Sequence, residues 1–128
     1  MGVFNAATSE FVYINAGHNP PIIVRANGET ELLETGGLIL GCLPEAVYEE
    51  GTVQLKLGDL LFMYTDGVSE AMNDDEEEFG EDRIRDFIVA HRTLPPAEIL
   101  SQLEDAVNHF CGREPNEDDS TMLIARRV

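Results

Sequence analysis

The sequence predicts an α+β fold built on antiparallel sheets. Residues that favour strands, β-branched and aromatic, are concentrated in the first half of the 128-residue chain, and apolar residues at helical spacing appear only after residue 80. The early strands are joined by short turn signals. Strands that come first and helices that come later are typical of α+β domains rather than of parallel βαβ folds. The length is that of one domain.

The first strands are predicted by local composition and by one turn. Residues 11–15 are rich in β-branched and aromatic side chains. The Asn27-Gly28 pair is a strong hairpin signal because both of its residues tolerate the positive φ of a tight turn. It therefore predicts a hairpin between strands at residues 22–26 and 30–33.

Two further strands differ in how they are buried. Residues 53–57 alternate between apolar and polar side chains, which predicts one buried face. Residues 60–64 (LLFMY) have no polar alternation, so both faces should be covered. Because two short helices supply only one layer, we expect one face of this strand to lack cover within the chain.

The second half predicts two helices and a closing strand. Apolar residues recur at helical spacing from Asp82 onward. A second helix is expected at residues 95–111, because prolines stand at its start and Gly112 just past its end. Residues 121–127 are expected to form the last strand.

Composition excludes several classes of function. The formal net charge is −17, from 25 acidic and 8 basic residues, so nucleic acid and anionic membrane surfaces are not expected partners. No apolar run is long enough to cross a bilayer and no secretory signal is visible, which predicts a cytoplasmic protein without membrane insertion. Cys42 and Cys111 are expected to be free thiols.

Residues 74–78 are five consecutive acidic residues. The simplest interpretation is a solvated loop. Calcium binding is an alternative, but the run lacks the alternating ligand spacing of an EF-hand loop.

Carboxylates stand at the edges of two predicted strands. Asp66 follows the buried strand 60–64, and Asp118 and Asp119 precede the last strand. If the two strands are neighbours, Asp66 and Asp118 converge at one end of the sheet, where Mg²⁺ or Mn²⁺ could bind their oxygens. From spacing alone, two ordinary turn carboxylates remain the simpler interpretation.

Residues 15–21 (NAGHNPP) form a rigid loop after a strand. His18 is the one candidate for a catalytic role, as a general acid, a substrate contact or a metal ligand, and it could equally be a hydrogen-bonded loop histidine. No second histidine stands at zinc-binding spacing. His91 and His109 lie on the predicted helices and are expected to be structural or surface residues.

Three stretches in this order resemble the SpoIIE/RsbU-type branch of the PPM (type 2C) metal-dependent serine/threonine protein phosphatases. They are residues 15–21 (NAGHNPP), 58–71 (GDLLFMYTDGVSEA) and 118–121 (DDST). The Phe79-Gly80 pair before a helix is also similar. Each motif is common, but the ordered set is specific and covers nearly the whole chain.

The resemblance implies an α-β-β-α sandwich, of which this chain would supply antiparallel sheets and two helices. It implies two Mn²⁺ or Mg²⁺ ions, with Asp66 and Asp118 as ligands. Gly67, Asp119 and Asn15 would lie near the site. A metal-activated water would then attack the phosphorus of phosphoserine or phosphothreonine.

The resemblance also implies that residues 1–128 are a single partial domain. Family members carry an earlier segment, with further aspartate ligands and two more helices, before the strand that ends in NAGH. Here that strand starts at Phe11. We therefore expect a fragment that is inactive or nearly so and that self-associates through exposed apolar surface.

The implied substrate is a phosphorylated protein, such as an anti-anti-sigma STAS protein of a bacterial partner-switching circuit. The alternative is a non-catalytic regulatory or dimerising interaction module.

Overall fold

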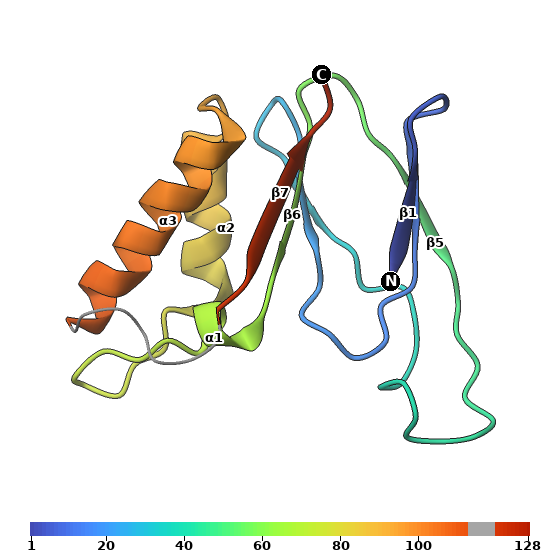
Figure 1. The fold of residues 1–128 in the computed structure, drawn as a ribbon, viewed down its shortest axis with the longest axis horizontal. Helices are drawn as coiled ribbons and strands as arrows, with labels where there is room; N and C mark the ends of the chain where they lie inside the picture. Colours follow the sequence, from blue (N-terminus) through green and yellow to red (C-terminus); the bar gives the residue numbers. More distant parts are fainter. Residues whose placement is uncertain (113–119) are drawn as a thin grey trace.

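The computed structural model describes residues 1–112 and 120–128. They form three layers, in which helices cover one face of a four-stranded sheet and a three-stranded sheet lies on the other side (Figure 1). This confirms the predicted α+β class. The elements in chain order are β1 (Gly2–Asn5), β2 (Glu10–Tyr13), β3 (Ile22–Val24), β4 (Thr30–Leu32), β5 (Gly51–Gln54), β6 (Leu60–Tyr64), α1 (Asp66–Ser69), α2 (Gly80–His91), α3 (Pro96–Cys111) and β7 (Met122–Arg126).

The two sheets have the strand orders β1-β2-β5 and β4-β3-β6-β7. Every pair of these strands is antiparallel, as predicted. The Asn27-Gly28 hairpin is confirmed, since β3 pairs with β4 across it. β6 pairs with β7 from Leu60 opposite Arg126 to Tyr64 opposite Met122. The end of β6 therefore lies beside the start of β7.

The main core lies between the helices and the four-stranded sheet. β6 contributes Leu60, Phe62 and Tyr64 to it. The helical spacing seen in the sequence supplies the other side, with Ile84 and Ile88 of α2 and Ile99, Leu103, Val107 and Cys111 of α3. Helix α3 ends at Gly112, whose φ of 65° places it in the left-handed conformation that glycine adopts at little cost. The predicted stop signal is confirmed.

A second core lies between the two sheets, and it corrects one expectation. Leu61 of β6 packs there with Phe11, Tyr13, Ile23, Leu33, Val53 and Leu55. Both faces of β6 are therefore covered, as its continuous apolar run predicts. The expectation that one face would lack cover was wrong, because the three-stranded sheet of the same chain covers it. Among the described residues, the outer face of that sheet carries no helix (Figure 1).

Three local details differ from the sequence prediction. β1 was not predicted, since all four of its residues are exposed and give no periodic signal. The short helix α1 was expected to be a simple turn. Leu57 was expected on a buried face but is 75% exposed, because β5 ends at Gln54 and a turn follows, closed by the Asp59 N–H donating to the Lys56 carbonyl at 3.0 Å.

Asp59 organises that turn. Its carboxylate accepts hydrogen bonds from Arg25 Nη1 at 2.8 Å, from the Lys56 N–H at 2.9 Å and from the Ala26 N–H at 3.1 Å. The residue is only 1% exposed. It therefore joins the start of β6 to the end of β3 through a buried, fully hydrogen-bonded charge.

Two predictions from composition can be compared with the fold. None of the described helices is both long enough and apolar enough to cross a membrane. Cys42 is exposed and Cys111 is buried, and no disulfide joins them.

Candidate functional site

The Asp66 turn stands where the buried strand β6 emerges from the core. α1 begins at Asp66, and its first turn is closed by the Val68 N–H donating to the Thr65 carbonyl at 3.0 Å. The Asp66 carbonyl accepts from the Glu70 N–H at 2.8 Å and from Ser69 Oγ at 3.3 Å. The backbone of Asp66 is thus held in place by hydrogen bonds, while the residue as a whole is exposed to solvent.

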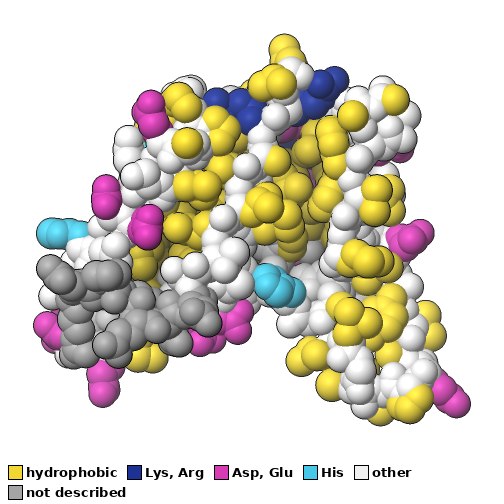
Figure 2. Space-filling model, viewed as in Figure 1, with side chains coloured by type: hydrophobic (Ala, Val, Ile, Leu, Met, Phe, Trp, Pro, Cys, Tyr) yellow, Lys and Arg dark blue, Asp and Glu magenta, His cyan; other side chains and the backbone are white. Residues whose placement is uncertain are grey.

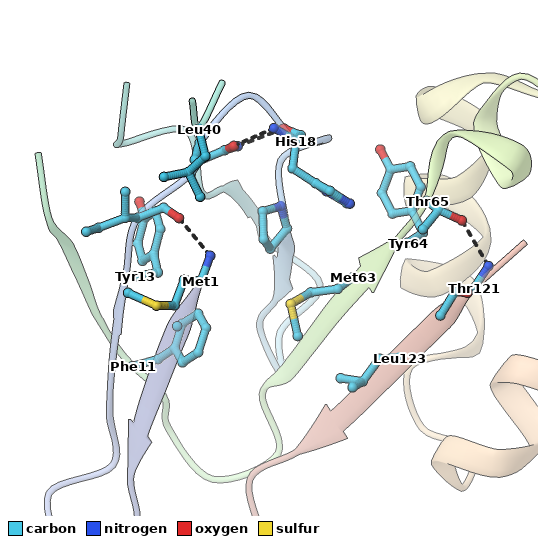
Figure 3. Close-up of a pocket in the computed structure, with 15 residues that line it drawn as sticks. Met1, Phe11, Tyr13, His18, Leu40, Met63, Tyr64, Thr65, Thr121 and Leu123 are labelled. Carbon is cyan, nitrogen blue, oxygen red and sulfur yellow. Dashed lines mark hydrogen bonds between the residues drawn. The ribbon is translucent and has the colours of Figure 1, made fainter. Parts of the chain in front are cut away.

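Thr65 and Thr121 join the two strand ends. The Thr65 N–H donates to the Thr121 carbonyl at 3.0 Å. The Thr121 N–H donates to Thr65 Oγ1 at 2.9 Å, as Figure 3 shows. The condition stated from the sequence, that the two strands are neighbours, is confirmed. Asp118 and Asp119 lie outside the described residues, so their convergence with Asp66 stays a prediction.

The loop at residues 15–21 is held by Asn15. Its Nδ2 donates to the His18 carbonyl and its Oδ1 accepts from the His18 N–H, both at 2.9 Å. Its backbone is clamped by the Thr35 carbonyl and the Gly37 N–H, each at 2.9 Å. Asn15, predicted to lie near the site, therefore shapes the loop with its side-chain amide.

His18 lies exposed on this loop. Its Nδ1 is 3.0 Å from the Asn19 carbonyl, and its side chain projects toward the side of Tyr64 and Thr65 in Figure 3. Asn19 Nδ2 donates to Ser69 Oγ at 3.3 Å, which connects the loop to α1. The structure therefore brings the loop at residues 15–21 to the Asp66 turn, a contact that no spacing in the sequence indicated.

Tyr64 is a second residue that the sequence did not single out. Burial, and then the negative charge of Glu81, raise the pKa of the Tyr64 hydroxyl well above its usual range. The hydroxyl is hydrogen-bonded to the Glu81 carboxylate. This contact attaches the end of β6 to the first turn of α2.

We expect Gly36→Ala to distort the loop at residues 15–21. A Cβ at Gly36 would lie 1.7 Å from the Asn15 carbonyl oxygen, so the backbone must move, at a cost of about 1–3 kcal/mol in unfolding free energy. Urea denaturation and the NMR signals of the His18 ring measure the two effects. Gly41→Ala is the control for the His18 signals: its φ of 85° strains any side chain, but no atom lies within 4 Å of the added Cβ to pass a displacement on to the loop. Unchanged His18 signals in Gly36→Ala would contradict the expectation.

A cavity of about 490 Å³ lies between the two sheets. Phe11 and Tyr13 line it from one sheet, and Met63 and Leu123 from the other (Figure 3). His18, Thr65 and Thr121 also contribute to its lining. Asp66 does not line it, so this largely apolar hollow lies next to the candidate site and is not the place of its carboxylate chemistry.

The metal-binding capacity of the described residues is small. They include no group of three or more histidine, cysteine, aspartate or glutamate side chains that could hold a metal ion. The acidic residues 74–78 are exposed, and the Asn73 side chain shapes their loop by accepting from the Asp75 and Glu77 N–H groups at 3.0 and 2.9 Å. Calcium binding thus gains no support from the described part of this loop.

The helical histidines behave as predicted. His91 Nδ1 is 2.8 Å from the Phe87 carbonyl, and its ring stacks on the Phe87 ring at a centroid distance of 4.0 Å. His109 is exposed on α3.

Comparison with known proteins adds independent evidence. Protein IcfG of Synechocystis sp. is 30% identical to the chain over 128 residues, which are 99% of this chain and 20% of that protein. Phosphoserine phosphatase RsbU of Bacillus subtilis is 26% identical over 127 residues, 98% of this chain and 37% of that protein. The chain thus spans well under half of either relative.

The fold also matches a solved phosphatase. The manganese-soaked phosphatase domain of SpoIIE from Bacillus subtilis superposes with a TM-score of 0.74 at 23% identity, over 99% of this chain and 55% of that one. At this identity the match shows the fold. The sequence model of the family described as Stage II sporulation protein E (SpoIIE) matches residues 1–128. The chain therefore belongs to the SpoIIE family, whose solved phosphatase domains have the type 2C fold.

Proposed function

We propose that this chain is part of a metal-dependent phosphoserine/phosphothreonine protein phosphatase. The observation that carries the proposal is the position of Asp66, which follows the largely buried strand β6 and stands at the sheet end where Thr65 pairs with Thr121. The backbone that carries this carboxylate is fixed by hydrogen bonds. Such a backbone is suited to a metal site, which must keep its ligands in a fixed geometry.

The proposed cofactor is a pair of Mn²⁺ or Mg²⁺ ions. The exposed Asp66 carboxylate is the hard oxygen donor that these ions prefer, and Asp118 is the proposed second ligand. When bound, the ions would supply a water of lowered pKa as nucleophile and would offset charge on the phosphoryl oxygens. Gly67 would allow close approach of a ligand to the backbone, with Asp119 near the ligands.

The loop at residues 15–21 would form one side of the entrance to this site. Asn15 fixes the loop, and Asn19 connects it to α1. His18 is exposed on this loop. Its ring is the candidate general acid or substrate contact.

We also propose that residues 1–128 are a partial domain, and that turnover requires ligands from further polypeptide. Three observations support this. The chain spans 55% of the SpoIIE phosphatase-domain chain, the described residues supply too few carboxylates for a binuclear site, and the apolar cavity between the sheets has room for further side chains.

The proposed substrate is a phosphorylated protein, by similarity to the relative named phosphoserine phosphatase. An anti-anti-sigma STAS protein in a cytoplasmic partner-switching circuit is the specific proposal. The net charge of −17 would repel a phosphorylated surface, so bound cations would be needed to bring the phosphate to the site.

Metal removal tests the proposed function. We expect the full-length protein that contains this chain to hydrolyse p-nitrophenyl phosphate with Mn²⁺, to lose activity in EDTA and to regain it when Mn²⁺ is added back. The 128-residue chain alone should show little turnover in the same assay. Turnover that survives EDTA would contradict metal dependence, and robust turnover by the isolated chain would contradict the partial-domain proposal.

One observation favours the alternative of an interaction module. The segment between β4 and β5 carries five exposed apolar side chains, and such surfaces favour association. They are Leu38, Ile39, Leu40, Leu43 and Val47. An interaction module would self-associate through this segment and show no metal-dependent turnover in the full-length protein.

A further inference from the structure

The few basic residues of this acidic protein are gathered at one end. Seven of the eight lie among the described residues, and five of these seven are at the end of β6 and β7 opposite to Asp66. Figure 2 shows Lys and Arg side chains together at this end of the molecule. The five are Arg25, Lys56, Arg92, Arg126 and Arg127.

Hydrogen bonds show that these residues share one surface. Arg126 donates to the carbonyls of Arg92 and Leu94, both at 2.6 Å. Arg92 Nε donates in turn to the Ala26 carbonyl at 3.3 Å. The backbone of Arg127 pairs with Gly58 and Asp59, at 2.8 and 2.9 Å, next to Lys56 in the chain.

One of the five charges is neutralised by side-chain carboxylates, and the other four are not. Arg25 forms ion pairs with Asp59 at 2.8 Å and Glu31 at 2.6 Å. Within the described part of the chain, no ion pair with a side chain involves the other four. The hydrogen bonds of Arg92 and Arg126 run to backbone carbonyls, and that of Arg127 runs to the main-chain oxygen of Val128, the last residue of the sequence. A carbonyl satisfies a guanidinium donor without cancelling its charge. We call these four residues, Lys56, Arg92, Arg126 and Arg127, the basic end.

The basic end is locally positive although the protein is strongly negative. At physiological ionic strength, charges are screened beyond about 8 Å, so a ligand at this surface responds mainly to the residues next to it. Two exposed carboxylates belong to the same surface, Glu29 and Glu31, and Glu31 is paired with Arg25. A broad polyanion such as a membrane or a duplex would meet both carboxylates, whereas a narrow segment along Lys56 and Arg127 would meet Glu29 alone.

The surface also contains a hollow and an apolar side chain. A cavity of about 320 Å³ is lined by Lys56 and Leu57, by Glu29, by the paired Arg25 and Asp59, and by Ala26 and Asn27. Leu57 is 75% exposed. An apolar residue this exposed beside unneutralised cations fits a ligand that has both carboxylates and one apolar group.

We propose that the basic end is a docking surface for a short acidic segment of a partner protein. Carboxylates of the segment lie against Lys56 and Arg127, and an apolar side chain covers Leu57. The surface is at the far end of β6 and β7 from the candidate site, so the partner binds without blocking it. Electrostatic docking of this kind raises the rate of association and selects partners by charge.

The test measures the binding of a fluorescein-labelled peptide, GEELEEG, to the protein by fluorescence anisotropy in low salt. We expect Lys56→Glu and Arg127→Glu each to weaken binding by at least about fivefold. Both side chains are suitable, because within the described residues neither Lys56 Nζ nor the Arg127 guanidinium forms a hydrogen bond with another side chain. Arg85→Glu is the matched control, with the same change of charge on α2, and should change the dissociation constant by less than about twofold.

Further probes separate the proposal from its alternatives. We expect no binding of the glutamine peptide GQQLQQG, weaker binding to Leu57→Ser, and loss of binding in about 0.5 M NaCl. The proposal is overturned if Arg85→Glu weakens binding as much as Lys56→Glu, which would indicate a response to net charge alone. Absence of peptide binding at about 1 mM also overturns it. So does tighter binding to vesicles of phosphatidylcholine and phosphatidylserine than to the peptide, which would make the surface a membrane site.

Discussion

Asp66→Asn is expected to lower the metal-dependent phosphatase activity of the full-length protein by about two to three orders of magnitude. The substitution removes the negative charge that would bind the cation and keeps the size of the side chain. The fold should be unaffected, since the residue is exposed and the hydrogen bonds that hold its turn run to its backbone carbonyl. Steady-state hydrolysis of p-nitrophenyl phosphate over a range of Mn²⁺ concentrations measures both kcat and metal affinity.

Glu70→Gln provides the matched control for this variant. Glu70 is also an exposed carboxylate, four residues further along the chain, at the end of α1. It undergoes the same change of charge but does not follow the buried strand directly. We expect its activity to stay within a few-fold of wild type. Wild-type activity in Asp66→Asn, or an equal loss in both variants, would show that Asp66 is not a ligand.

Asp59→Ala is expected to lower the free energy of unfolding by about 3–5 kcal/mol, which is the usual effect of removing one partner from a buried ion pair. The change leaves the N–H groups of Lys56 and Ala26 without their side-chain acceptor. It also removes the buried carboxylate from Arg25, which keeps only Glu31 and the Gln54 carbonyl. Urea denaturation of the isolated chain measures the loss. Asp82→Ala is the control, because its ion pair with Arg85 is exposed and contributes at most about 0.5 kcal/mol. Equal effects in the two variants would contradict the role given to Asp59.

The same carboxylate predicts how stability depends on pH. Burial opposes ionisation of Asp59, but the hydrogen bond from Arg25 and those from the Lys56 and Ala26 N–H groups together lower its pKa. A folded-state pKa below the unfolded-state value of about 3.9 means that this stabilisation is complete above that value. It is lost as the pH falls through the folded-state pKa. Asp59→Asn should therefore show a shallower loss of stability in acid than wild type, and an identical acid profile would refute the assignment.

Elements with a strong local pattern were predictable from the sequence. Strand β6 was found because its apolar run has no polar interruption, which requires two covered faces whatever the rest of the fold. Helix α3 was found because its apolar spacing, its prolines and Gly112 are all local signals. The Asn27-Gly28 turn fixed the β3–β4 hairpin in the same way.

Elements without such a pattern were missed. β1 is exposed throughout and is held in its sheet by pairing with β2 alone. The burial of Asp59 was missed as well, because an aspartate after glycine is most often an exposed turn residue. Only its contact with Arg25, which follows β3 and is 34 residues away in the sequence, makes it part of a buried ion pair.

The features of the candidate site also differ in whether the sequence alone could predict them. The sequence alone identified Asp66 at the end of a buried strand, and its ordered motifs identified the family, because both depend on residues close together in the chain. Only the tertiary structure decided that Thr65 pairs with Thr121, that Asn19 contacts Ser69, and that the second sheet covers β6. Contacts between segments 50 or more residues apart depend on strand order and register. The periodicity of a single segment does not encode them.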